Sequence, residues 1–445
     1  MLGVGASGPL MEAPGPRAAG AMDAAGAKDV ADAAGAADAE RDAWAILAGV
    51  DGLGPVGLAA LLQRFRTGRE VLRIATGPRG VHELMSTPHG TPAGDGTRRR
   101  PISPGLASAI ADAANDGDRF LTRLREIGLT VVTVDDATYP SRLASVELPP
   151  ALLFVLGDVR ALESAHAIAV VGTRRPSDAG RALASRIGAA LVAAGASVVS
   201  GLAVGIDGAV HDATVASGGS TVAVIGGGHA TLYPRAHRAL ADAIVASGGA
   251  VVSELAPDAS PTKGTFPRRN RVISGLSDAT VVVEAPARSG ALITASWALE
   301  QGRECFLVPG AIGAPESEGC LAFLREFPGG ARIVAGIPQL LDDLGLVHGS
   351  RTAALAPATI TVLGETAGVV AAGLVAGLAT VDELVAATGL PVATVLATLT
   401  LLERDRLAVG VHGRFRPAGT LAAQPSADPR RRARVLARSD DPMLP

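Results

Sequence analysis

The chain has 445 residues, enough for roughly two to four domains, and 48% of them are hydrophobic. Two cysteines are too few for a disulfide framework, no uncharged apolar run reaches the roughly 18 residues of a membrane span, and the N-terminus lacks a signal core, so we expect a cytoplasmic protein. The net charge of −3 excludes a chain that is basic overall, so any contact with nucleic acid must come from a local patch.

The N-terminal part of the sequence divides into a low-complexity tail and a helical module. Residues 1–40 are rich in Ala, Gly and Asp, and we expect them to be disordered because they bury too little apolar surface to offset ordering entropy. Within residues 41–127, Ala43–Leu47 and Val56–Leu62 have helical spacing, and the turn Val50–Pro55 separates them. This resembles a helix-hairpin-helix (SAM-like) module, which offers backbone amides to phosphate. A purely structural helical bundle is the alternative, and both readings stay open.

Residues 128–345 alternate between short apolar runs and helical segments. The runs that we predict as strands are Leu129–Val134, Leu152–Leu156, Ile168–Val171, Ser197–Ser200, Thr221–Ile225, Ala250–Ser253, Thr280–Glu284 and Glu304–Val308. Alternation of this kind predicts βαβ units and an α/β fold, here a doubly wound, Rossmann-like parallel sheet with helices on both faces. A ligand of such a domain lies beyond the carboxyl ends of its strands.

The C-terminal part begins with a linker, residues 346–357. Residues 358–418 then contain a helix from Val381, a Gly-containing turn, a second amphipathic helix and a short β-hairpin, the order of a winged-helix-like module. The remaining residues, 419–445, form a basic tail that we expect to be disordered and solvated.

Small and charged residues follow the predicted strands of the central domain. Gly172-Thr173-Arg174 follows the run ending at Val171, Ser200-Gly201 ends the next one, and Ser289-Gly290 precedes Thr294 farther along. Glycines let the backbone approach a ligand closely, and helix N-termini offer free amides to anions. Each glycine alone could form only a tight turn, but together with nearby cations these strand ends predict a pocket for phosphates.

A cationic and aromatic stretch, Thr265–Gly275, carries the strongest signal in the chain. Phe266 opens it, and Arg268, Arg269 and Arg271 surround Asn270; Lys263 lies just upstream. Cations beside a flat ring are the chemistry that holds a phosphate backbone and stacks a base. A capped, solvated helix start is the simpler alternative for this stretch taken alone.

Signatures of catalysis are missing from the strand ends. The sequence contains no G-x-G-x-x-G after the first strand of the alternating region, no Walker P-loop and no G-x-S-x-G elbow. His211 more often packs against a sheet in this position than acts as a base, and Asp207 is expected to accept helix-start amides. His229 and His237 lack a third ligand at metal spacing, so we expect no metal.

The motifs, taken in order, resemble the DprA (Smf) family of DNA-processing proteins from about Leu129 to Leu344. They are Gly172-Thr173-Arg174, Ser200-Gly201-Leu202-Ala203 followed by Gly205-Ile206-Asp207, Tyr233-Pro234, Phe266-Pro267 with Arg269-Asn270-Arg271, and Ser289-Gly290 with Leu292-Ile293-Thr294-Ala295. The resemblance implies a non-enzymatic, cofactor-free, cytoplasmic homodimer. It also implies that the protein binds single-stranded DNA and loads RecA recombinase onto it, in natural transformation and homologous recombination.

The resemblance also implies roles for individual residues. Arg174 and Lys263 would contact phosphates, and Phe266 would stack a base. The full set expected to bind DNA is Gly172, Thr173, Arg174, Ser200, Gly201, Lys263, Phe266, Arg269, Asn270, Arg271, Ser289, Gly290 and Thr294. The sequence departs from the family pattern at Val204, His229, His237 and Cys320, which puts details of the pocket rim in doubt.

Two other readings compete with DNA binding. Ser289-Gly290, Thr294 and Glu300 echo a Rossmann-like nucleotide phosphoribohydrolase of the lysine-decarboxylase-like type, but the Pro-Gly-Gly-x-Gly-Thr turn of such enzymes is missing. A purely structural scaffold conflicts with the clustered cations.

Overall fold

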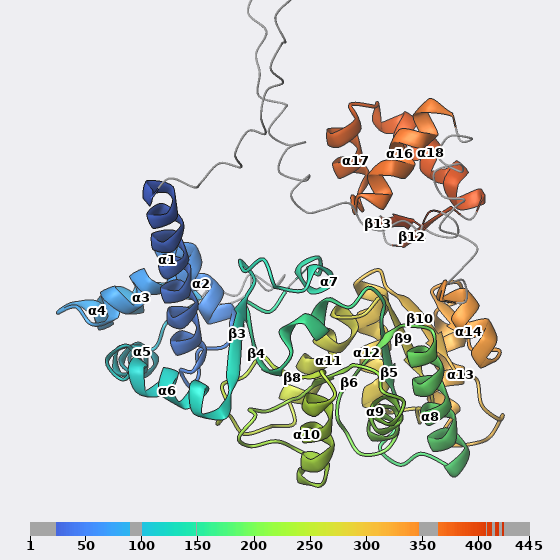
Figure 1. The fold of residues 1–445 in the computed structure, drawn as a ribbon, viewed down its shortest axis with the longest axis horizontal. Helices are drawn as coiled ribbons and strands as arrows, with labels where there is room; N and C mark the ends of the chain where they lie inside the picture. The colour runs from blue at the N-terminus through green and yellow to red at the C-terminus, as the bar shows by residue number, and fades with distance from the viewer. Residues whose placement is uncertain are drawn as a thin grey trace, which may run out of the picture.

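The computed structural model describes residues 24–89, 100–147, 149–346, 364–405, 407–411, 414–417 and 421 (Figure 1). They form a helical N-terminal module, a central α/β domain and a small C-terminal module. Residues 1–23, almost all of the linker and almost all of the basic tail lie outside the described residues, so the expectations for these segments stay predictions.

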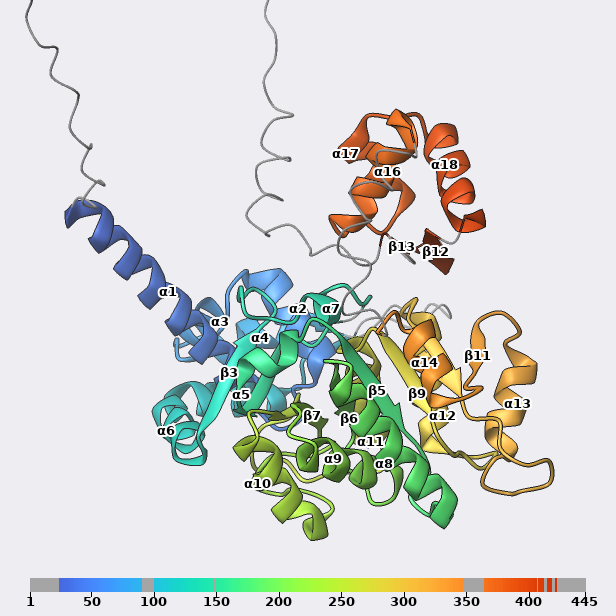
Figure 2. The same ribbon diagram turned by 45° about the vertical axis from the view of Figure 1, so that its right-hand side comes forward.

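Helix α1 (Ala24–Ala48) differs from the expected disorder of residues 1–40, since the chain is helical from Ala24. Figure 2 shows its N-terminal half extending away from the other helices. Alanine, the residue with the highest helix propensity, dominates this sequence. Two side-chain contacts secure the C-terminal half: Trp44 Nε1 donates to Glu40 (2.6 Å), and Arg41 pairs with Asp136 of the central domain (2.8 Å). Helix propensity and these anchors together outweigh the ordering entropy that the composition suggested.

The rest of the N-terminal module consists of short helices packed around one apolar core. They are α2 (Pro55–Phe65), α3 (Gly68–Ala75), α4 (Gly80–Met85), α5 (Pro104–Asn115) and α6 (Gly117–Ile127), with a small hairpin of β1 (Pro88–His89) and β2 (Arg100–Pro101). The turn between α1 and α2 places Gly52 at φ 85°, a conformation that favours glycine. It buries Leu53 in the core beside Leu47. The two predicted helices and their turn are thus confirmed.

The central domain is built on a nine-stranded sheet in the order β11-β10-β9-β5-β6-β7-β8-β4-β3. Its strands are β3 (Leu129–Thr133), β4 (Leu152–Gly157), β5 (Ala167–Val171), β6 (Ser197–Ser200), β7 (Thr221–Val224), β8 (Ala250–Ser253), β9 (Ala279–Val282), β10 (Glu304–Leu307) and β11 (Ala331–Ile333). Neighbours from β11 to β8 are parallel, whereas β4 and β3 join antiparallel at one edge. The chain adds β6, β7 and β8 on one side of β5 and returns to add β9 on the other, which confirms the doubly wound prediction.

Both faces of this sheet are covered, as alternation along β5 illustrates. Ile168 and Val170 belong to a core with α8 (Asp178–Ala193), α9 (Ile206–Ala216) and α14 (Ile337–Asp343), and Ala169 and Val171 belong to a core on the opposite face. The elements that cover that second face are α7 (Ser141–Ala144), α11 (Thr265–Gly275), α12 (Gly290–Glu300) and α13 (Glu318–Glu326). Helix α10 (Arg238–Ala246) lies beside α9 over β7 and β8.

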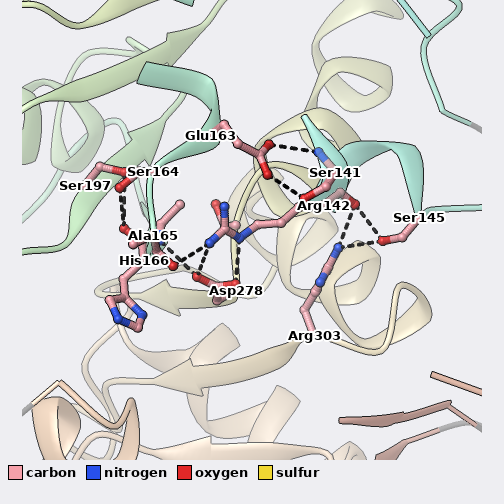
Figure 3. A network of polar contacts seen from close by, with 12 residues as sticks. Ser141, Arg142, Ser145, Glu163, Ser164, Ala165, His166, Ser197, Asp278 and Arg303 are labelled. Carbon is pink, nitrogen blue, oxygen red and sulfur yellow. Dashed lines mark hydrogen bonds and ion pairs between the residues drawn. The ribbon is translucent and has the colours of Figure 1, made fainter. Parts of the chain in front are cut away.

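A network of polar contacts connects α7 to the N-terminal ends of β5 and β9 (Figure 3). Arg142 donates to both carboxylate oxygens of Asp278, at 2.6 and 3.1 Å, and to the carbonyl oxygen of Ala165. Asp278 also accepts the amide of Ala167 (2.9 Å), the first residue of β5. Asp278 therefore joins the beginning of β5, the approach to β9 and helix α7.

We expect Asp278→Ala to destabilise the protein by about 1–3 kcal/mol, because it removes the charged acceptor and leaves Arg142 and the Ala167 amide without it. Urea unfolding followed by circular dichroism measures this loss. Arg160→Gln, which breaks only a pair on the exposed surface, is the control and should leave the midpoint nearly unchanged. Equal midpoints for both variants would contradict a structural role for the network.

The C-terminal module has the winged-helix order that the sequence predicted. Its elements are α16 (Glu365–Val375), α17 (Val381–Thr388), α18 (Val392–Arg404), β12 (Ala408–Val411) and β13 (Arg414–Pro417). Leu374, Leu384 and Leu399 meet in its core. A capping box, in which Thr380 and Glu383 each accept a backbone amide of the other, fixes the start of α17. Among the described residues, no single helix is long and apolar enough to cross a membrane; α17 and α18 pass that test only as a pair, bent by 116°.

Candidate functional site

A cavity of about 940 Å³ lies at the carboxyl ends of the central strands, beside the switch point at β5. Ten of the residues predicted from the sequence line it: Gly172, Thr173, Arg174, Lys263, Phe266, Arg269, Asn270, Ser289, Gly290 and Thr294. The N-terminal ends of α11 and α12 both contribute to the wall, so two helix dipoles present their positive ends there. Positive helix ends of this kind attract anions.

The turn after β5 presents the first cation. Thr173 donates its amide to the carbonyl oxygen of Glu284 (2.7 Å), which joins the ends of β5 and β9. Gly172 fits tightly, since a Cβ atom there would approach Ile206 to 2.5 Å. The exposed side chain of Arg174 then extends over the ring of Phe266, with its guanidinium carbon 5.3 Å from the ring centroid.

Phe266 forms the aromatic wall of the cavity. Its ring lies against Gly226, where a Cβ atom would come within 2.8 Å of it. Tyr233, half exposed, meets the same ring edge-on at a centroid distance of 5.9 Å. The backbone after β7 and the side chain of Arg174 therefore hold one aromatic ring between them at the cavity surface.

Exposed cations give the cavity a local positive charge in a chain of net charge −3. Arg174, Arg175, Lys263 and Arg288 all line it, and none of them forms an ion pair within the part of the chain that the structure describes. The carboxylates among its described lining residues are the buried Asp207 and the partly exposed Glu316. Unpaired cations next to helix N-termini bind phosphate groups without breaking existing salt bridges.

Arg269 does not face the ligand as the other cations do, because it is buried beneath the cavity. It donates to the carbonyl oxygens of Gly201 (2.7 Å) and Val224, at the ends of β6 and β7. Asp207 accepts the amides of Gly201 (3.2 Å) and Ala203 (3.4 Å). Burial lowers the pKa of Arg269 to about 10 and raises that of Asp207, while the attraction between the two groups opposes both shifts. Arg269 therefore joins the strand ends that form the floor.

Asn270 and Thr294 also form part of the cavity wall, and both are buried. The Asn270 side chain donates to the carbonyl oxygen of Gly290 (3.0 Å) and accepts from Arg269 (3.2 Å), so it links α11 to the start of α12. Thr294 is almost fully buried. The Asn270 side chain is hydrogen-bonded within the protein and that of Thr294 is buried, whereas the cations of the cavity are exposed to solvent.

Three predicted residues, Ser200, Gly201 and Arg271, are not among those that line the cavity. Ser200 is buried and donates to the carbonyl oxygen of Val170 (2.6 Å). Arg271 forms an ion pair with Glu254. Burial raises the pKa of that carboxyl, and the pairing opposes the shift without reversing it. The expectation that Arg271 completes the pocket is therefore not met by its position. Consecutive residues of a helix point in directions about 100° apart, and sequence alone did not identify which arginine would be turned away.

Three cationic or aromatic lining residues are absent from the predicted set: Tyr233, Arg175 and Arg288. Tyr233 belongs to the Tyr-Pro motif, to which the sequence assigned no role, and Arg175 directly follows Arg174. None of the departures from the family pattern, Val204, His229, His237 and Cys320, lines the cavity. Among the described residues, no three His, Cys, Asp or Glu side chains come together as a metal site requires.

The turn that resembles a helix-hairpin-helix is only partly buried. Leu53 packs in the core and, with Gly54, lines a small cavity of about 130 Å³ beside Leu152 and Leu255 of the central domain. Asp51, Gly52 and Gly54 are exposed, so both readings of the N-terminal module stay open.

His211, considered above as a possible base, lies buried on α9. Thr221 donates its single hydroxyl proton to the carbonyl oxygen of Val198 (2.7 Å), so its oxygen accepts from Nδ1 of His211 (2.8 Å). This assigns the proton to Nδ1 and leaves Nε2 as a buried atom without a partner in the described structure. Burial lowers the pKa of His211 to about 3, so the ring is neutral and structural.

His211 should make the folded state sensitive to acid. An unfolded histidine, with a pKa near 6.5, takes up a proton that the folded state refuses until about pH 3, so stability is complete above pH 6.5 and falls as the pH drops through that window. We expect His211→Gln to lose about 2 kcal/mol less between pH 7 and pH 5 than the unsubstituted protein does. Urea unfolding at each pH measures the difference; parallel profiles below pH 6.5 would contradict it, whereas parallel profiles above pH 7 are expected.

Comparisons with known proteins agree with this architecture. Residues 130–345 match the family of DNA recombination-mediator protein A, and residues 354–414 match the DprA winged helix domain. The chain is 39% identical to the DNA processing protein DprA of Bacillus subtilis over 226 residues, which cover 51% of this chain and 75% of that protein. It is 36% identical to a putative DNA processing protein DprA of Mycobacterium tuberculosis over 339 residues, or 73% of this chain and 85% of that one.

A solved structure shares the fold. The X-ray structure of DNA processing protein A from Streptococcus pneumoniae superimposes with a TM-score of 0.53 at 30% identity, covering 66% of this chain and 95% of that one.

Proposed function

The chain belongs to the DprA (Smf) family of DNA-processing proteins, and on this premise we propose that it binds single-stranded DNA in the cavity at the strand ends and passes the strand to RecA recombinase. The observation that carries the proposal is the combination of unpaired cations and an accessible aromatic ring on one cavity wall. Cations of this kind bind the sugar-phosphate backbone, and a ring stacks a base regardless of sequence.

Arg174 and Phe266 act together in this proposal. The guanidinium of Arg174 lies over the face of the ring, a contact that contributes about 0.5–1 kcal/mol at an exposed site. A stacked base contributes about 1–3 kcal/mol, and a displaced guanidinium gains a charge-assisted bond to a phosphate. The exchange favours the complex, so Arg174 would move from the ring to the backbone when DNA enters.

The competing enzymatic reading lacks its arrangement of residues. Thr294 is buried in the cavity wall, and Glu300, at the exposed end of α12, is not among the lining residues. Glu300, the carboxylate that the sequence offered for this chemistry, therefore does not reach a substrate in the cavity. We therefore propose a binding protein without catalytic activity, acting in the cytoplasm as a homodimer during transformation and recombination. Release of free base from a nucleoside monophosphate would overturn this view.

Removing the two exposed cations should weaken binding and reduce its salt dependence. For Arg174→Ala/Lys263→Ala we expect the slope of log affinity against log salt to become shallower by about 0.7 for each lost phosphate contact. Fluorescence anisotropy with a labelled oligonucleotide at several salt concentrations measures both effects. Arg160→Ala, which removes an exposed arginine outside the cavity, is the matched control and should keep the unsubstituted slope. An unchanged slope in the double variant would place the DNA elsewhere.

The position of Phe266 can be tested without removing it. Gly226→Ala introduces a methyl group where the ring now lies, so it should displace the ring and weaken single-strand binding in the same direction as Phe266→Ala, which we expect to cost about 1–3 kcal/mol. Gly105→Ala is the control, because its Cβ atom meets open space on α5, outside the cavity. Tight binding by both Gly226→Ala and Phe266→Ala would return Phe266 to a packing role.

A further inference from the structure

We propose that Tyr233 is a second platform for a base and that its angle to Phe266 makes the cavity select single strands over duplexes. The proposal rests on the proposed function of the cavity and names the residue that sets its preference. Tyr233 presents a half-exposed aromatic ring to the cavity.

The chain has two tyrosines, and Tyr233 is the exposed one, with 52% of its surface accessible. The other, Tyr139, is buried and donates its hydroxyl to the carbonyl oxygen of Pro150 (2.7 Å). Among the described aromatic rings, that of Tyr233 pairs with Phe266. A large aromatic side chain left at the rim of a cavity is typical of a recognition surface.

The loop that carries Tyr233 is held in place by its own backbone. The adjacent Leu232 is buried in the core under α10, and the amide of Ala230 donates to the carbonyl oxygen of Pro257 (2.9 Å). The hydroxyl of Thr231 donates to the carbonyl oxygen of Ala259 (2.6 Å). The ring is thus presented on a braced segment, so a base that stacks on it does not have to pay for ordering the loop.

The two rings are not parallel, and this is the decisive geometry. Their planes meet at 62° with centroids 5.9 Å apart. Successive bases of a stacked strand are parallel and about 3.4 Å apart, so two neighbouring bases that rest on these rings must splay away from each other. A single strand does this readily. A duplex has to break stacking and pairing, which costs a few kcal/mol per step.

The cations and the two rings therefore contribute to different properties of binding. Arg174 and Lys263 meet phosphates, which both forms of DNA carry, so the cations strengthen binding of either form. The pair of Tyr233 and Phe266 meets only unpaired bases. Removing Tyr233 should reduce the preference for single strands, whereas removing cations should weaken both forms together.

The test compares Tyr233→Ala, Tyr233→Phe and Tyr233→Leu in anisotropy titrations with a labelled oligothymidylate and with a duplex of the same length. We expect Tyr233→Ala and Tyr233→Leu to bind the single strand about 5- to 140-fold more weakly, and the duplex within about twofold of the unsubstituted protein. Tyr233→Phe keeps the ring and should keep the single-strand affinity. Because Tyr233 is exposed, thermal melting should be unchanged in all three variants.

The outcomes separate this inference from the proposed function. If the unsubstituted protein binds no single strand, both fail. If it binds, and Tyr233→Ala keeps the same ratio of single-strand to duplex affinity, the second platform is wrong while the proposed function stands. A loss in Tyr233→Ala that Tyr233→Leu restores would show that apolar packing rather than stacking is at work, and would also overturn the inference.

Discussion

The cavity depends on two buried charges beneath its floor, those of Arg269 and Asp207. Arg269 donates to the carbonyl oxygen of Gly201, just after β6, and to that of the last residue of β7, and Asp207 accepts the amides that follow β6. The peptide groups on both sides of Gly201 are therefore fixed. Transferring charges into the interior is costly unless they are hydrogen-bonded. Here the bonds go to backbone groups at the ends of β6 and β7. Asp207 of α9 and Arg269 of α11 both bond to Gly201, so the groups that satisfy the buried side chains also fix the backbone that forms the surface above them.

The switch point of the sheet explains why the exposed groups converge. β5 lies between β6 and β9, and the chain leaves these strands in opposite directions, which opens a crevice above their carboxyl ends. The turn of Arg174, the start of α11 and the start of α12 all border this crevice. A chain with net charge −3 can in this way present a cationic surface, because the field near a ligand is governed by charges within about a Debye length rather than by the sum over the molecule.

Much of the fold was accessible from the sequence because its signals are local. Strand runs such as Ile168–Val171 are continuous, apolar and bounded by small residues, and the observed β5 extends this run by one residue at Ala167. The N-terminal part of helix α1, before residue 41, was not predicted because composition reports ordering entropy but not the anchoring contacts of Glu40 and Arg41. The site was predicted as a set of residues, but the burial of Arg269 and the pairing of Arg271 depend on rotation about a helix axis and on partners far away in sequence, such as Glu254.

Because the chain has only two lysines, the amine of Lys263 distinguishes the cavity chemically from the rest of the central domain. The chain has 40 basic residues, and only Lys28 and Lys263 carry a primary amine on the side chain. Lys263 is exposed at the cavity, whereas the guanidinium groups around it do not react with mild acylating reagents. Acylation would neutralise its charge without altering the arginines. A lysine-directed label would therefore mark this one wall of the central domain.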